Sequence, residues 1–194
     1  VSKRAFDKAK YLEKLTMSAS VTELEWECFT NMIRLKQIEF SENLSEISYA
    51  CCRGSKKLEK VVFPKAEKFS VDLCAFSETN IDTLVLPINA VYLKVCTYDI
   101  MDPFYSFEKI VCYNPKMRIF EQQPEFDYPM TFCANKNSTV QKYVDKYKQD
   151  YNIQFEELYP YPIEVSEEIL DRFDVTVDDM AVTEADKEYE GTKV

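Results

Sequence analysis

The segment Leu58-Glu59-Lys60-Val61-Val62-Phe63-Pro64 contains the apolar pattern that decides the fold, and this pattern occurs four times between Leu12 and Leu86. Three apolar columns recur every 23 residues without drift: Leu12, Leu35, Leu58 and Ile81; Leu15, Ile38, Val61 and Leu84; and Met17, Phe40, Phe63 and Leu86. A fixed period between about 20 and 50 residues indicates a solenoid, in which each repeat forms one coil that stacks on the next. We therefore expect the first column to be the buried seam of a stack.

Each L-x-x-L-x-L core predicts a short strand of the leucine-rich-repeat kind. The second and third apolar columns are two residues apart, so they share one face of that strand, which is the core face. The residues between these columns then point away from the core, because successive strand residues alternate. These outward residues are Thr16, Glu39, Val62, Val85 and Val111.

The repeats resemble the BspA-like leucine-rich repeat family, also called the Treponema pallidum type. Phe6, Phe29 and Phe76 match the family's phenylalanine, which Cys52 replaces in the third unit, and Pro64 and Pro87 match its strand-ending proline. The resemblance covers about residues 1–158 and implies a leucine-rich-repeat solenoid, α+β overall, with regular coils over about residues 5–95. The family's usual glycine is nearly absent, so we expect Asn, Ser and Glu in the turns.

The end of the repeat domain, residues 1–158, is less regular. Ile110 follows Leu84 by 26 residues, which predicts an irregular coil over about residues 96–115, with Asp99–Tyr105 in an expanded loop. A strand at Met130–Cys133 and a helix should close the stack over about residues 129–150, as in the closing unit of similar proteins. Ser138 and Gln141 form a capping box, and the helix's apolar positions follow at i, i+3, i+4 and i+7: Val140, Tyr143, Val144 and Tyr147.

Residues 159–194 form an acidic C-terminal segment. They hold eleven acidic and three basic residues, a net charge of −8 out of −10 for the whole chain. Ser166 could cap a short helix over Glu167–Phe173, and the composition beyond Asp178 predicts a mobile end. This charge disfavours nucleic acid and anionic membranes as partners, because both require a basic face.

Composition argues against most enzyme classes and against cofactors. The chain has two glycines and no histidine, which removes glycine-rich phosphate loops, the commonest general base and the commonest metal ligand. Catalytic carboxylate pairs remain, at Glu39 with Glu59 or at Asp99 with Asp102, but a solenoid sheet offers a shallow surface where a glycosidase needs a cleft. The sequence contains no run of about 18 apolar residues, so it predicts no membrane-spanning helix.

Cysteines form a further column of period 23 at Cys28, Cys51 and Cys74. Stacked coils would place these thiols about 5 Å apart. A disulfide or metal ladder is one interpretation. We favour buried free thiols, because the chain has seven cysteines and no C-x-x-C pair, and free cysteine fills small buried positions well.

The outward residues are the candidate binding surface. We call Val62, Val85 and Val111 the valine strip, because a contiguous line of exposed apolar residues marks a partner surface or something that covers it. The strip could bind a protein or dock the acidic segment, or its valines could simply favour strands. The candidate partner-binding residues are Val62, Val85, Val111, Tyr113, Glu39, Thr16, Lys60 and Lys109.

We therefore expect a non-enzymatic scaffold for protein interaction or adhesion, without cofactors. The family resemblance implies a cell-surface or secreted location and a host or cell-surface protein partner. Two alternatives remain open: a structural spacer or accessory module of a longer polypeptide, and a carbohydrate-binding surface on which Trp26 or tyrosines stack on sugar rings. The chain enters the repeat pattern part way through a unit, so we also expect residues before Val1.

Overall fold

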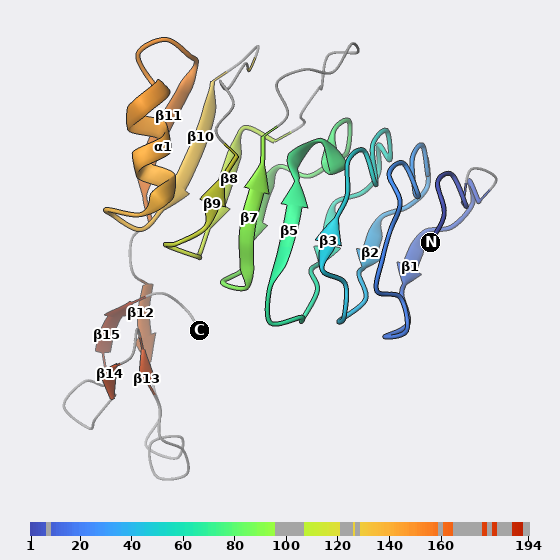
Figure 1. Cartoon of the computed structure of the whole chain (residues 1–194), viewed down its shortest axis with the longest axis horizontal. Helices are drawn as coiled ribbons and strands as arrows, with labels where there is room; N and C mark the ends of the chain where they lie inside the picture. The colour runs from blue at the N-terminus through green and yellow to red at the C-terminus, as the bar shows by residue number, and fades with distance from the viewer. Residues whose placement is uncertain are drawn as a thin grey trace. The chain divides into compact units, whose positions relative to one another are not determined.

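The computed structural model describes residues 1–6, 9–95, 107–120, 126, 129–158, 161–164, 176–177, 180–181 and 188–191, with side chains up to residue 158. The chain divides into two compact units, Val1–Glu156 and Glu157–Val194. The first unit is a solenoid of stacked coils, which confirms the predicted fold class. Figure 1 shows its strands following one another along the stack.

One face of the solenoid consists of two sheets. Strands β1 (Lys14–Thr16), β2 (Gln37–Glu39) and β4 (Lys60–Val62) form a parallel three-stranded sheet. A four-stranded sheet follows, in the order β6 (Thr83–Leu86), β8 (Lys109–Cys112), β10 (Met130–Ala134) and β11 (Ile153–Glu157). Leu15 lies opposite Ile38 and Ile38 opposite Val61, so the 23-residue period of the sequence is the register of the first sheet.

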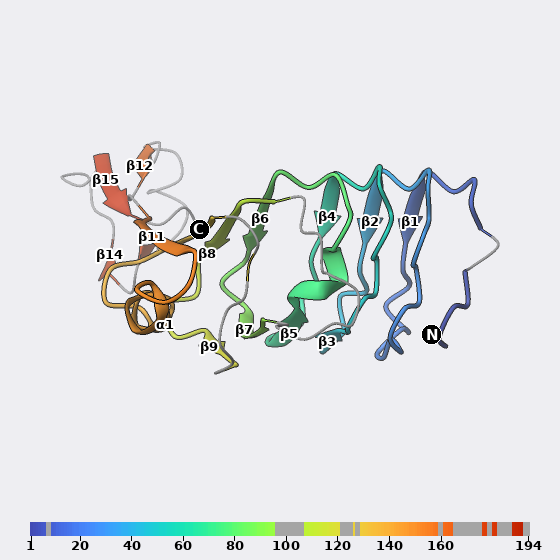
Figure 2. The same cartoon turned by 90° about the horizontal axis from the view of Figure 1, so that it is seen from above.

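A second parallel sheet, which we did not predict, covers the other side of the core. It contains β3 (Glu46–Ile47), β5 (Phe69–Asp72), β7 (Ala90–Lys94) and β9 (Arg118–Ile119), in that order. Figure 2 shows the two rows of strands on opposite sides of the stack. A 3-10 helix, η1 (Leu73–Phe76), follows β5.

The first apolar column is the buried seam everywhere but at its start. Leu35, Leu58 and Ile81 are buried, whereas Leu12 is 37% exposed, so the prediction of a seam was wrong for Leu12. The reason is positional. Strand β1 is an edge strand of its sheet, so the first coil has a neighbouring coil on one side only.

The turns of the coils use residues in the left-handed region of φ. Arg4, Glu27 and Ala50 have positive φ at a spacing of 23 residues, and so do Asn31 and Gly54. Asn and Glu were expected at such positions and occur there. In the described part of the chain no serine has a positive φ. Arginine and alanine occupy such positions instead, at Arg4 and Ala50.

The closing helix is α1 (Thr139–Tyr147), and it begins where the capping box predicted. The Ser138 hydroxyl accepts a hydrogen bond from the Gln141 N–H at 3.2 Å. The Gln141 side chain differs from the standard box, because it accepts from the N–H of Asn137, at 2.6 Å, and not from that of Ser138. Asn137 has a φ of 62°, and the Ser138 N–H donates to the Asn135 carbonyl.

The second unit contains two antiparallel pairs of strands. β12 (Tyr161–Glu164) pairs with β15 (Glu188–Gly191), and β13 (Thr176–Val177) pairs with β14 (Met180–Ala181). Strands β14 and β15 lie beyond Asp178, where the sequence predicted a mobile end. The predicted helix Glu167–Phe173, the expanded loop Asp99–Tyr105 and Cys96 lie outside the described residues.

Candidate functional site

The outward residues of the strands form two aligned groups. Thr16 lies opposite Glu39, and Glu39 opposite Val62, across β1, β2 and β4. Val85 lies opposite Val111 across β6 and β8, and Cys133 on β10 continues that row. These residues alternate with core residues such as Leu84 and Ile110, so they share the outer face of their sheets.

The valine strip is unevenly exposed. Val85 is 43% exposed, whereas Val62 and Val111 are half-buried. Tyr113 is also half-buried, and its N–H donates to the Leu86 carbonyl at 3.1 Å, which extends the ladder between β6 and β8 past the strand ends. Val85 is therefore the most accessible apolar contact that the strip offers.

Lys60 and Lys109, which flank the valine strip, differ in whether the side chain forms an ion pair with another described residue. Lys60 is exposed, whereas the Lys109 ammonium lies 2.6 Å from Oε1 of Glu156 on β11. This ion pair spans the intervening strand β10, where Cys133 is only 4% exposed. The outer face is thus apolar at β6 and β8 and covered by charges at β10 and β11.

A shallow hollow brings two predicted residues, Glu39 and Val62, together near the ends of β2 and β4. Its volume is about 240 Å³, and its lining is Met17, Ala19, Glu39, Phe40, Glu42, Val62, Phe63 and Lys65. The Thr16 hydroxyl donates to Oε2 of Glu39 at 3.3 Å and orients that carboxylate. Met17 and Phe63 pack against the core, as their column predicts, but both are only half-buried and also contribute an apolar wall to the hollow.

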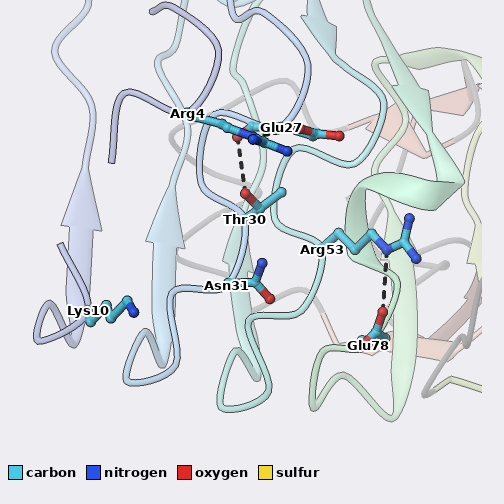
Figure 3. Close-up of a pocket in the computed structure, with 7 residues that line it drawn as sticks. All are labelled: Arg4, Lys10, Glu27, Thr30, Asn31, Arg53 and Glu78. Carbon is cyan, nitrogen blue, oxygen red and sulfur yellow. Dashed lines mark hydrogen bonds and ion pairs between the residues drawn. The ribbon is translucent and has the colours of Figure 1, made fainter. Parts of the chain in front are cut away.

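A larger hollow of about 490 Å³ lies among the turns (Figure 3). Its lining is Arg4, Lys10, Glu27, Thr30, Asn31, Arg53 and Glu78. Nε of Arg4 lies 3.0 Å from Glu27, and Nε of Arg53 lies 3.3 Å from Glu78, as Figure 3 shows for the second pair. Each pair joins side chains of successive coils, and both acidic residues among the described lining residues are paired with an arginine.

The cysteine column is buried, as expected. Cys28, Cys51 and Cys74 are free thiols in the core. Burial raises the pKa of Cys28 to about 12 and also raises the pKa of the Cys112 and Cys133 thiols. Such thiols stay protonated at neutral pH and are poor nucleophiles. Within the described residues, no group of three or more His, Cys, Asp or Glu side chains could hold a metal ion.

Trp26, the tryptophan proposed for sugar stacking, is not part of the valine strip. Trp26 is 47% exposed, but the Lys3 ammonium lies 3.0 Å from its ring centroid. One face of the indole is therefore occupied by a side chain from the neighbouring coil, 23 residues earlier in the sequence. Glu39 and Glu59, the candidate catalytic pair, lie on β2 and just before β4, and Asp99 and Asp102 lie outside the described residues.

Comparison with protein families agrees with this geometry. The family described as BspA type Leucine rich repeat region matches residues 1–99, in six copies. The chain belongs to this family. Repeats of the BspA type are generally non-enzymatic and often serve in adhesion or protein interaction, and members are often associated with the cell surface.

Searches of curated proteins and of solved structures found no match to this BspA-type chain. Among its described residues, no helix has both the length and the apolar content needed to cross a membrane.

Proposed function

We propose that this BspA-type chain is an interaction or adhesion scaffold that binds a protein partner through the valine strip. The supporting observation is the exposure of Val85 on the outer face of a sheet in which Val111 lies directly opposite it. The partner would contribute an apolar surface to Val85 and Val111, and Lys60 and Glu39 would supply polar contacts at the margin. The frequent surface association of the family supports a cell-surface or secreted location, and a host or cell-surface protein is the partner that we propose.

A valine-to-aspartate substitution tests this proposal. Val85→Asp places a charge in the centre of the strip, where a partner would have to desolvate it. Val91→Asp is the matched control, because Val91 is a half-buried valine on β7, in the opposite sheet. We expect the unmodified chain and the Val91 variant to retain the same protein from cell-surface extract, and the Val85 variant to lose it. The interaction should then be reproduced with the purified partner.

The spacer alternative makes the opposite prediction. A module that only separates other domains would retain no protein whose capture depends on Val85. A glycan array probed with the unmodified chain and the same two variants tests carbohydrate binding. If the chain binds a glycan and Val85→Asp abolishes that binding, the ligand of the strip is a sugar and not a protein.

A further inference from the structure

A third hollow, of about 470 Å³, lies between α1 and β9, and its lining includes no residue of the valine strip. Its lining is Arg118, Ile119, Thr139, Lys142, Tyr143 and Lys146. Three of these six side chains are cationic and none is acidic, in a chain whose net charge is −10. We propose that this hollow, which we call the cationic pocket, binds an acidic peptide segment of a partner protein.

The fold builds the pocket from one helix face and one strand. Thr139, Lys142, Tyr143 and Lys146 stand at i, i+3, i+4 and i+7 on α1, so they share one face. The first turn of α1 is tied to the segment before β9, because the Thr139 N–H donates to the Pro115 carbonyl and its hydroxyl donates to the carbonyls of Pro115 and Met117. These bonds hold the two lysines beside Arg118.

Two of the three cations of the pocket, Arg118 and Lys142, have no acidic partner among the described residues, whereas the Lys146 ammonium lies 4.9 Å from the centroid of the Tyr147 ring. The nearby carboxylate of Asp145 is paired with Lys148 at 2.6 Å. Lys142 and Lys146 are one helical turn apart, and like charges at that spacing destabilise a helix. An anion bound beside Arg118 and Lys142 would supply the opposite charge that these two side chains lack within the described part of the chain.

The arrangement favours several carboxylates over one compact anion. The cations come from two elements and surround the hollow, and the Thr139 hydroxyl is already donating to backbone carbonyls. Side chains at i and i+4 start about 6 Å apart, so successive carboxylates of an extended peptide can reach both lysines. Ile119 and the buried Tyr143 supply an apolar wall for the peptide's aliphatic atoms.

Fluorescence anisotropy of a fluorescein-labelled hexaglutamate peptide, titrated with the full chain at low salt, tests the proposal. We expect binding that weakens as salt rises and that weakens about tenfold in the double variant Arg118→Gln/Lys142→Gln. Lys136→Gln is the matched control, because Lys136 is exposed and lies outside the pocket lining. Circular dichroism confirms that each variant is folded.

Three results would overturn the proposal: no binding by the full chain, equal binding by the double variant, or equal weakening by Lys136→Gln.

Competition with other anions identifies the class of ligand. If inorganic phosphate displaces the peptide at equal charge concentration, the pocket is a single-oxyanion site. If a sulfated oligosaccharide binds more tightly through Arg118 and Lys142, the ligand is a glycan. The test does not involve the valine strip, so either proposal can fail alone.

Discussion

Gly54 is one of only two glycines in the chain, and its position shows why a side chain is excluded there. Its φ is +73°, and a Cβ atom at this position would lie 2.3 Å from Oδ1 of Asn31. Asn31, one coil earlier, has a φ of 55°. Asparagine tolerates the left-handed region better than most residues, so the two coils make the same turn with different residues, and only the later coil requires glycine.

Gly54→Ala should therefore reduce the free energy of unfolding by about 1–3 kcal/mol, because it adds both backbone strain and a clash. Urea unfolding followed by circular dichroism measures the change. Asn31→Gly should by itself be nearly neutral, and in the Gly54→Ala background it should restore part of the lost stability by removing the clash. A double variant no more stable than Gly54→Ala would contradict this account.

At the scale of the element, each coil contributes one residue to the buried seam, two residues before its strand, and the cost of removing that residue depends on its neighbours. Leu58 is fully buried between coils, whereas Leu12 is packed on one side only. Leu58→Ala should lower the free energy of unfolding by about 2–5 kcal/mol, and Leu12→Ala by less than half as much. Urea unfolding of both variants measures these changes in the free energy of unfolding. Equal decreases would mean that the first coil is as tightly packed as the third.

Strands β1, β2, β4 and β6 of the first face could be predicted because their period of 23 residues is constant, and the strands of the second face could not. Ile47, Val71, Leu93 and Ile119 are successive members of the second sheet's core rows, yet their spacings are irregular. A register shift between Phe69 and Ser70 accounts for part of this. Without a fixed period, short strands of two to five residues leave little signal in a sequence.

Strand β11 was missed despite a usable signal. Phe155 follows Phe132 by 23 residues, and Gln154 donates to the Thr131 hydroxyl across the same spacing. Helix α1 lies between the two strands in sequence, which hid the resumed period. The same omission concealed the partner of Lys109, because Glu156 reaches it from β11. The outward direction of Val62, Val85 and Val111 needed only strand alternation, so it was predictable; their unequal exposure was not.

At the scale of the whole molecule, the buried thiols and Tyr143 make the free energy of unfolding decrease at alkaline pH. Burial raises the pKa of Cys28 from its ordinary 9.0 to about 12, and it also raises the pKa of Cys112, Cys133 and Tyr143. Below pH 9 the Cys28 thiol is protonated in both the folded and the unfolded chain. Above pH 9 the unfolded chain loses that proton first, so unfolding becomes more favourable.

We therefore expect the contribution of these groups to stability to be constant from neutral pH to about pH 9 and to fall as the pH rises toward 12. Cys28 alone should contribute a loss of about 2 kcal/mol by pH 10.5. Urea unfolding at pH 7.5, 9.5 and 10.5 under reducing conditions measures the trend. Cys28→Ala should show a shallower decline than the unmodified chain, and a flat profile in both would contradict the burial of these thiols.

The constant register of β1, β2 and β4 also makes a coil an interchangeable cassette. Excising residues 38–60 would join Gln37 to Val61 and leave the L-x-x-V-x-F frame intact, because the segment removed equals one full period. The shortened chain would present Thr16 directly beside Val62. Gene-level gain or loss of such cassettes could thus lengthen, shorten or recompose the outer face without redesigning the core, so the binding surface can diversify faster than the architecture that supports it.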